Sequence, residues 1–425
     1  MKIKAFNKGF KAELKNIAAD KSISHRFAIF ALLSDETSLA KNYLLAEDTL
    51  NTLKIIENLG AKVERKGAEV RISPSPKIKE PTCILECGNS GTAMRLMVGF
   101  LAGIEGFFVL SGDKYLNKRP MKRITQPLKE IGAKIMGREG ANYAPICIEG
   151  QNLKAFNYTS EISSAQVKTA MILAGFKADA TSYFKENFLS RNHSENMLSF
   201  MEAPLKIQKT SLEISPLKKP LKPLNITIPN DPSSAFYFVL ATLILPNSQI
   251  CIKNVLLNPT RIEAYKVLEK MGAKISYEFD KKNYEQIGTI YASSSKLKAI
   301  EVSENIAWLI DEAPALAIAF ALAKGTSVLK NAKELRVKES DRIKAMVKNL
   351  QKCGIDAEEL EDGFKITGGT PKAAMIESFG DHRIAMSFAI LGLVCSMEID
   401  DSSCIATSFP NFTTLLESLG VQIDY

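Results

Sequence analysis

The sequence predicts an α/β protein built from two similar halves. Three observations support this: a helix–glycine–strand pattern recurs along the chain, polar helix starts recur in phase with it, and a segment rich in proline and lysine separates the halves. The chain has 425 residues, of which 46% are hydrophobic and 24% are charged. It is therefore long enough for two or three hydrophobic cores and has the balance of a globular protein.

The recurring pattern is an apolar helix face, then a glycine, then alternating apolar residues. It occurs in ENLGAKVE, KEIGAKIM, EKMGAKIS, QKCGIDAE and ESLGVQID, with glycines at Gly60, Gly132, Gly272, Gly354 and Gly420. Such a glycine ends a helix in the left-handed conformation, and the alternation predicts a strand. The gap between Gly132 and Gly272 is about twice the others, so a sixth copy is expected near Glu202. Six units of about 70 residues then account for the whole chain.

Polar segments begin apolar helical runs once in each of these repeats. They are DKSISHRFAIF, GNSGTAMRLMV, ISSAQVKTAMI, NDPSSAFYFVL, IDEAPALAIAF and GDHRIAMSFAI. Ordinary helix capping explains any one of them. Six in register predict three buried helices per half, with their unpaired N–H groups and positive dipole ends pointing the same way. We place the boundary near Pro229. Two such ends facing each other would form a cleft that concentrates anions.

Composition excludes several classes of protein. The opening segment MKIKAFNKGF has no apolar core, and the apolar run from Ala307 to Ala323 is interrupted by Asp311, Glu312 and Pro314, so we expect a cytoplasmic protein without a membrane span. Seven scattered cysteines and three histidines predict neither a disulfide framework nor a zinc site. The net charge of +8 suggests anionic partners, but the basic residues are dispersed and no nucleic-acid motif accompanies them.

Charged residues gather at the predicted helix starts. Lys21 and Arg26 flank SISH, Asn89 and Arg95 flank SGTAM, and Arg383 follows GDH. Further cations and interleaved carboxylates are Arg119, Arg191, Arg336, Lys338, Arg342, Asp311, Glu339 and Asp341. Arginine forks suit carboxylates and lysine suits phosphate, so the set predicts a ligand that carries both groups. The same carboxylates could transfer protons, although a charged helical face explains ELRVKESDR nearly as well.

Eight ordered motifs carry a resemblance to a known family. GNSGTAMR, RPM, SSAQVK, RNHSE, NPTR, ELRVKESDR, GDHR and ATSFP resemble 3-phosphoshikimate 1-carboxyvinyltransferases, or EPSP synthases, of the variant often called class II. The resemblance implies an inside-out α/β barrel of two domains, each with three βαβαββ repeats. Residues 18–229 would form one domain, and residues 1–17 with 230–425 the other.

The resemblance also implies a reaction. The family transfers the enolpyruvyl (carboxyvinyl) group of phosphoenolpyruvate to the 5-hydroxyl of shikimate 3-phosphate and releases phosphate, a step of chorismate and aromatic amino acid biosynthesis. It uses no metal or other cofactor, and its members are usually monomers. The expected partners are therefore the two small-molecule substrates, and neither nucleic acid nor membrane.

By resemblance, individual residues receive roles. Shikimate 3-phosphate would bind its carboxylate to Ser22 and Arg26, its phosphate to Ser164 and Arg191, and its ring hydroxyls to Asp311 and Lys338. Lys21 and Gln166 would also contact shikimate 3-phosphate. Phosphoenolpyruvate would bind its carboxylate to Arg342 and Arg383. Its phosphate would bind Lys21, Arg119, Gln166, and the backbone around Asn89, Gly91 and Thr92. The catalytic groups would be Asp311, which accepts the hydroxyl proton, and Glu339 with Lys21, which move protons at C3.

Three positions depart from the family pattern. Ala19 and Asn230 stand where the family commonly has glycine, and a left-handed turn would be harder for Ala than for Asn. Thr407 replaces a lysine that reaches phosphate in some members. The last change removes one expected phosphate contact.

Two alternatives remain open at this point. The sister enolpyruvyl transferase that acts on UDP-N-acetylglucosamine shares the fold and phosphoenolpyruvate, but RPMKR lacks the cysteine of its usual loop. A non-catalytic polyanion-binding or RNA-binding protein would use the basic surface and show steep salt dependence. It would not need Asp311 and Glu339 among its cations.

Overall fold

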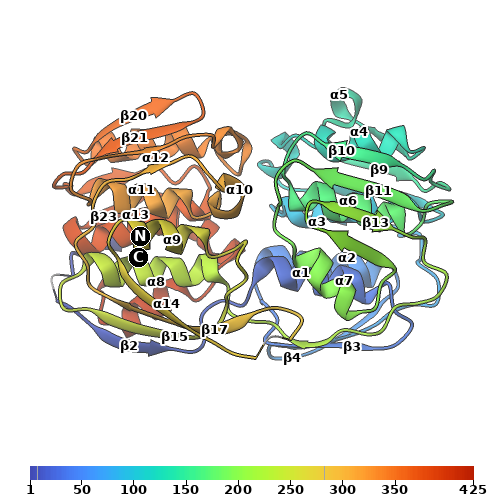
Figure 1. The fold of residues 1–425 in the computed structure, drawn as a ribbon, viewed down its shortest axis with the longest axis horizontal. Helices are drawn as coiled ribbons and strands as arrows, with labels where there is room; N and C mark the ends of the chain where they lie inside the picture. Colours follow the sequence, from blue (N-terminus) through green and yellow to red (C-terminus); the bar gives the residue numbers. More distant parts are fainter. Residues whose placement is uncertain (7, 282) are drawn as a thin grey trace. The chain divides into compact units, whose positions relative to one another are not determined.

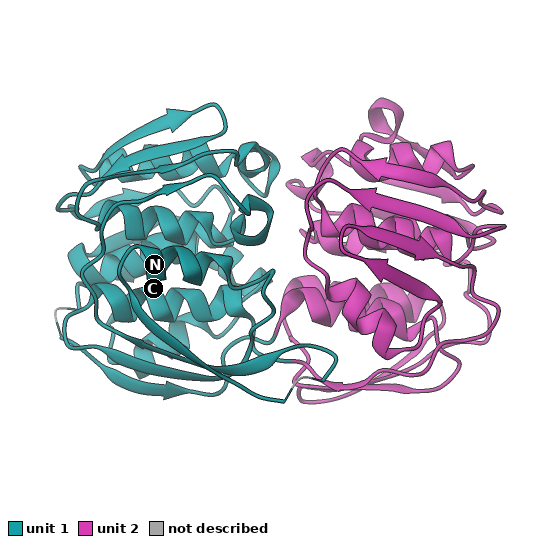
Figure 2. Ribbon diagram, viewed as in Figure 1, with its two compact units in different colours: residues 1–19, 229–425 teal, residues 20–228 magenta. Residues whose placement is uncertain are grey.

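The computed structural model describes residues 1–6, 8–281 and 283–425. The chain divides into two compact units, which Figure 2 shows in different colours. Unit 2 is residues 20–228, and unit 1 combines residues 1–19 with 229–425. The junctions expected from the sequence, after residues 17 and 229, lie within two residues of these positions.

Unit 2 contains three repeats with the same order of elements. The first is α1 (Lys21–Ala31), β3 (Ser38–Lys41), α2 (Glu47–Asn58), β4 (Lys62–Lys66), β5 (Glu69–Ser73) and the late strand β14 (Asn225–Thr227). The second is β6 (Leu85–Glu86), α3 (Gly91–Leu101), β7 (Phe107–Ser111), η1 (Leu116–Lys118), α4 (Lys122–Glu130), β8 (Lys134–Gly137), α5 (Arg138–Ala141) and β9 (Tyr143–Glu149). The third is β10 (Asn157–Ser160), α6 (Ala165–Gly175), β11 (Ser182–Glu186), α7 (His193–Phe200), β12 (Leu205–Gln208) and β13 (Ser211–Ile214).

Unit 1 repeats the same order three more times. Its first repeat is β2 (Lys11–Leu14), α8 (Pro232–Ile244), β15 (Gln249–Leu256), α9 (Glu263–Lys270), β16 (Lys274–Phe279) and β17 (Ile287–Ser293). The second is β18 (Glu301–Val302), α10 (Ile306–Leu309), α11 (Ala313–Ala321), β19 (Thr326–Leu329), η2 (Lys333–Val337), α12 (Arg342–Lys352), β20 (Asp356–Leu360) and β21 (Gly363–Thr367). The third is β22 (Ala374–Ile376), α13 (His382–Cys395), β23 (Met397–Ile399), η3 (Ser403–Thr407), α14 (Phe412–Ser418), β24 (Ile423–Asp424) and β1 (Lys2–Ile3).

Each repeat forms one four-stranded sheet with a common topology. In the order β6-β7-β9-β8, for example, β6 is parallel to β7, and the other two pairs are antiparallel. The other five sheets follow the same rule, including β22-β23-β1-β24 and β16-β17-β15-β2, which take strands from the start of the chain. The predicted βαβαββ repeats and α/β fold are therefore confirmed.

The helices of each unit fall into two classes. Three helices in each unit, α1, α3 and α6 or α8, α11 and α13, are buried on almost every side, whereas helices such as α2, α4, α9 and α12 bury only one face. Figure 1 shows the sheets of each unit outside its central helices. Packing is close, because a Cβ at Gly99 in α3 would lie 2.5 Å from Ala170 Cα in α6.

The repeat glycines adopt the conformation expected from their sequence context. Gly60, Gly132, Gly272, Gly354 and Gly420 have φ of 99°, 100°, 99°, 76° and 93°. Glu202 takes the corresponding position in the degenerate copy with φ of 60°. The sixth copy is thus confirmed, at the cost of a left-handed conformation that a residue with a side chain rarely adopts.

Neither Ala19 nor Asn230 makes a left-handed turn. Both have negative φ, and they pair with each other in an isolated antiparallel bridge. The Asn230 side-chain amide donates to the carbonyls of Lys15 and Lys253 at 2.9 and 2.8 Å. Glycine is therefore not required at either position, and the expectation of a strained turn at Ala19 was wrong.

Candidate active site

The three central helices of unit 2 begin side by side. Asp20, Ser90 and Ser164 are their N-caps, and each side chain accepts a hydrogen bond from a backbone N–H of the first turn. Gln166 in α6 donates to Thr92 in α3 at 2.9 Å and accepts from Arg95 Nη1 at 2.8 Å. These contacts place three sets of unpaired N–H groups at one end of the unit.

The start of α1 contributes two cations to this end of unit 2. Lys21 Nζ donates to Asp48 Oδ2 at 3.1 Å, and the Lys21 side chain keeps 18% exposure. Arg26 is buried, and three of its hydrogen bonds run to neutral oxygens: Ser194 Oγ at 2.8 Å, Ser22 O at 3.1 Å and Thr169 Oγ1 at 3.2 Å. Arg26 thus links α1 to α6 and α7, and these three partners do not neutralise its positive charge.

The start of α3 lies against two more arginines. Asn89 Nδ2 donates to Asp113 Oδ2 at 3.0 Å, and Arg119 Nη1 donates to the Asn89 carbonyl at 3.4 Å. A Cβ at Gly91 would lie 2.8 Å from Arg95 Nη1 and 3.0 Å from Arg119 Cζ. Glycine therefore lets both guanidinium groups lie close to the backbone at the start of α3.

The segment before α7 carries Arg191. Its neighbour Ser190 is held at both backbone groups: its N–H donates to Glu186 Oε1 at 2.9 Å, and its carbonyl accepts from Lys168 Nζ at 3.4 Å. Lys168 is buried and also pairs with Glu186 and Glu195, both at 2.7 Å. The motif residue Lys168 is thus structural, and it fixes the segment from which Arg191 projects.

In unit 1, Arg342 is surrounded by carboxylates. Its Nε donates to Asp381 Oδ2 at 2.8 Å and its Nη2 to Glu339 Oε2 at 2.6 Å. Burial opposes the charged form, but Asp381 and Glu339 outweigh it and raise the pKa of Arg342. Nη1 is buried and makes no hydrogen bond among the described residues, and the nearest carboxylate oxygen, Asp311 Oδ1, is 3.8 Å away. A buried N–H group of this kind can accommodate a ligand oxygen.

Asp311 lies between two arginines at the start of α11. Arg383 Nη1 donates to the Asp311 carbonyl at 2.8 Å, and its Nη2 is 3.8 Å from Asp311 Oδ2. The neighbouring Glu312 is buried, lies 3.9 Å from Arg383 Nη1 and accepts a hydrogen bond from Ser233 in α8. These contacts bring together the starts of α8, α11 and α13.

Three other residues of unit 1 have distinct surroundings. Burial lowers the pKa of Lys338, although Glu334 at 3.7 Å and Asp311 favour its charged form. Arg336 pairs with Asp341 and Glu359 at 2.9 and 2.8 Å, so it holds α12 to β20. The Thr407 hydroxyl donates to the Cys404 carbonyl at 2.7 Å.

The predicted site residues fall into one group in each unit. Unit 2 holds Lys21, Ser22, Arg26, Asn89, Gly91, Thr92, Arg119, Ser164, Gln166 and Arg191. Unit 1 holds Asp311, Lys338, Glu339, Arg342 and Arg383. Sequence reasoning missed two carboxylates next to the predicted site residues. Asp48 forms an ion pair with Lys21, and Glu312 lies near Arg383. Glu312 adjoins Asp311 in IDE and could have been suspected, whereas no local signal marked Asp48.

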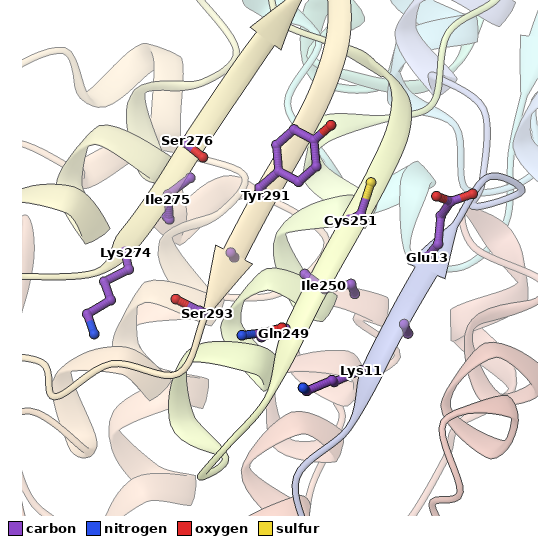
Figure 3. A pocket seen from close by; sticks show the side chains of 12 residues that line it. Lys11, Glu13, Gln249, Ile250, Cys251, Lys274, Ile275, Ser276, Tyr291 and Ser293 are labelled. Atoms are coloured by element: carbon purple, nitrogen blue, oxygen red, sulfur yellow. The ribbon is translucent and has the colours of Figure 1, made fainter.

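A separate groove lies on the outer face of a unit 1 sheet. Figure 3 shows the side chains that line it, including Lys11, Glu13, Cys251 and Tyr291 from β2, β15 and β17. The groove has a volume of about 680 Å³. None of its lining residues belongs to the predicted site.

Over the described ranges, no cluster of His, Cys, Asp and Glu side chains could hold a metal ion, and no helix is long and apolar enough to cross a membrane.

Comparisons with known proteins agree with this architecture. The sequence profile described as EPSP synthase (3-phosphoshikimate 1-carboxyvinyltransferase) matches residues 7–416. Proteins named 3-phosphoshikimate 1-carboxyvinyltransferase from Campylobacter jejuni and Campylobacter hominis are 68% and 60% identical over 428 and 424 residues, with 100% of both chains covered in each case. A solved EPSP synthase from Acinetobacter baumannii has a TM-score of 0.87 at 36% identity and covers 100% of this chain and 99% of that one. The chain belongs to the EPSP synthase family.

Proposed function

We propose that this enzyme transfers the enolpyruvyl group of phosphoenolpyruvate to the 5-hydroxyl of shikimate 3-phosphate and releases phosphate. Its membership of the family supports the reaction. The sister reaction on UDP-N-acetylglucosamine is not favoured, since the profile and the relatives carry the name of the shikimate enzyme. Cytoplasmic location and a monomeric state stay predictions of the sequence, and light scattering tests the second.

The observation that carries the assignment of anion sites is the gathering of helix starts in unit 2. Backbone N–H groups around Asn89 to Thr92, with Lys21 and Arg119, suit a phosphate group, because helix N-termini and cations both favour anions. We assign them, with Gln166, to the phosphate of phosphoenolpyruvate. Ser164 and Arg191 are assigned to the phosphate of shikimate 3-phosphate, and Ser22 with Arg26 to its carboxylate.

The carboxylate of phosphoenolpyruvate is assigned to Arg342 and Arg383 in unit 1. The support is that Arg342 is charged and buried, and that its Nη1 has no hydrogen-bond partner among the described residues. A ligand carboxylate would complete the hydrogen bonding of this arginine, as charge-assisted pairs commonly do. Asp311 and Lys338 are assigned to the ring hydroxyls of shikimate 3-phosphate.

The reaction needs an acid and a base that exchange roles. In the first step, Asp311 takes the proton of the 5-hydroxyl, the hydroxyl oxygen bonds to C2, and C3 gains a proton to form a methyl group. In the second step, a methyl proton leaves, the C2=C3 bond reforms, and the C2–O bond to phosphate breaks. We assign the proton transfers at C3 to Glu339 and Lys21.

Phosphate release from shikimate 3-phosphate and phosphoenolpyruvate tests the proposal. The purified chain should release one phosphate per enolpyruvyl shikimate 3-phosphate formed, and neither substrate alone should give phosphate. Turnover with UDP-N-acetylglucosamine, without turnover of shikimate 3-phosphate, would assign the chain to the sister reaction instead.

A further inference from the structure

His25 is a buried residue that has no assigned role in the function proposed for this enzyme. It lies in α1 beside Arg26 and has 0% exposure. Its Nδ1 is 2.7 Å from Thr52 Oγ1 in α2, and its Nε2 is 3.2 Å from Ser90 Oγ, the N-cap of α3. One imidazole ring therefore connects three helices next to the proposed phosphate site.

The hydrogen bonds around the ring select one tautomer. The Thr52 hydroxyl donates to the Asp48 carbonyl at 3.3 Å, so it can accept the Nδ1–H of His25. Ser90 Oγ accepts the N–H of Ala93 at 3.1 Å, and its own hydrogen can then bond to Nε2 of His25. The other tautomer would leave the hydroxyl hydrogen of Ser90, a residue with 2% exposure, without an acceptor.

The ring is also neutral. Burial is the main cause that holds the pKa of His25 well below its usual value, and the nearby charges of Lys21 and Arg26 act in the same direction. A charged ring would present N–H groups on both sides and break the hydrogen bond that it accepts from Ser90.

The same chain of contacts reaches the cation of α1. Thr52 bonds to the backbone of Asp48, and the carboxylate of Asp48 accepts a hydrogen bond from Lys21 Nζ. One end of this chain therefore fixes the cap of α3, and the other end fixes the partner of Lys21. Asn89 to Thr92 and Lys21 are the groups assigned above to a single phosphate group.

We propose that His25 is a positioning residue. Its ring, protonated at Nδ1, fixes the start of α3 relative to Lys21, so that both can bind the phosphate of phosphoenolpyruvate. The inference rests on the proposed function, because it takes the phosphate site from there. His25 does not touch the substrate and acts through Ser90, Thr52 and Asp48.

Two variants of similar size separate positioning from packing. H25M fills the space but can accept no comparable hydrogen bond from Ser90, whereas the amide oxygen of H25Q can. We expect H25M to raise the KM for phosphoenolpyruvate by about 3- to 10-fold, the scale of one lost neutral hydrogen bond. The KM for shikimate 3-phosphate should change less, and H25Q should recover most of the loss. In an S90A background, H25M should have a smaller effect than in the unmodified chain, because only the contact with Thr52 is then left to lose.

A matched control is T125V, which removes a buried hydroxyl of unit 2 that donates to the Ala141 carbonyl at 2.9 Å. It should lower Tm and leave both KM values unchanged. Equal KM values for H25M and H25Q, or parallel changes for both substrates, would overturn the proposal and reduce His25 to a packing residue.

Nitrogen-15 NMR tests the tautomer on the unmodified chain, which has only three histidines. The signals of His25, assigned by their loss in H25Q, should show a protonated Nδ1 and a bare Nε2 at neutral pH. Protonation at Nε2, or at both nitrogens, would overturn the proposal even if H25M failed to fold. Absence of enolpyruvyl transfer by the unmodified chain would instead overturn the proposed function, and the tautomer could still be measured.

Discussion

Units 1 and 2 have the same fold but differ in the contacts of several arginines. In unit 2, Arg26, Arg95 and Arg119 donate hydrogen bonds to hydroxyl and carbonyl oxygens, whereas the lysines Lys21 and Lys168 pair with carboxylates. In unit 1, Arg342 is held by the carboxylates of Asp381 and Glu339.

This difference matches different tasks. Neutral partners orient a cation and leave its charge for a ligand, whereas carboxylate partners compensate the charge in advance. Carboxylates can in addition accept protons, which hydroxyl groups and carbonyls do not readily do. These arginine contacts therefore suit anion binding in unit 2, and they suit combined binding and proton transfer in unit 1, with Lys21 as the proposed proton-transfer group from unit 2.

Removing one carboxylate in each unit should show the largest difference. D381N keeps a side chain that can cap α13 but removes the charge opposite Arg342, and both residues are buried. We expect it to lower the free energy of unfolding by about 3 to 5 kcal/mol. D48N in unit 2 should cost less than D381N, because the Lys21 side chain keeps 18% exposure whereas the Arg342 side chain keeps 1%. Urea unfolding of both variants checks this, and equal losses would contradict the comparison.

Arginine truncation should separate binding from stability. R383A should weaken phosphoenolpyruvate binding by roughly 2 to 5 kcal/mol, the scale for a buried charge pair that loses one partner. It should also lower Tm, because Asp311 loses a compensating charge. R119A should weaken binding with a smaller loss of Tm, because it donates to a backbone carbonyl. Calorimetric titration and thermal unfolding of the two variants would refute the distinction if both gave the same pair of changes.

The carboxylates of unit 1 should affect turnover more than binding. E339Q and D311N are expected to lower kcat by at least about 100-fold with smaller changes in KM, since acid and base groups act in the transition state. E358Q, which removes an exposed charge paired with Lys365, is the control and should leave kcat unchanged. Loss of binding with unchanged kcat would show that Glu339 and Asp311 only compensate Arg342.

Acid should weaken the two units in different pH ranges, and this is the smallest expected effect. Burial lowers the pKa of His25 well below 6.5; burial opposes the charged form of Asp381, but Arg342 outweighs it and lowers that pKa below 3.8. Both groups bind fewer protons when folded, so the stability they provide is complete above the unfolded pKa and declines as pH falls below it. The stability that His25 gives unit 2 should therefore begin to decline near pH 6.5, and the stability that Asp381 gives unit 1 only near pH 3.8.

Hydrogen exchange of α3 and α13, corrected for the intrinsic effect of pH, measures this order. H25Q should remove the decline of α3 near pH 6.5 and leave that of α13 unchanged. Earlier loss of protection in α13 would reverse the assignment.

The sequence alone predicted the repeats because their signals are local. A left-handed glycine after an apolar helix face, as at Gly60 or Gly132, depends on neighbouring residues, and the degenerate copy at Glu202 followed from the spacing. The partners of the charges depend on tertiary structure instead. Arg342 and Asp381 are 39 residues apart, and Lys21 and Asp48 are 27 apart. No local pattern distinguishes these pairs from other combinations, and the roles of individual residues in binding stay predictions.

The pairing of β1 has a consequence for synthesis of the chain. The strand Lys2–Ile3 lies between β23 and β24, so it pairs with Met397 to Glu398 on one side and with Ile423 to Asp424 on the other. A ribosome makes this strand before unit 2 and makes its two neighbours after unit 2. Unit 2, residues 20–228, has all its strands once Thr227 has emerged, but unit 1 must wait for Ile423 and Asp424. Unit 2 can therefore complete its fold while the strand Lys2–Ile3 is still unpaired.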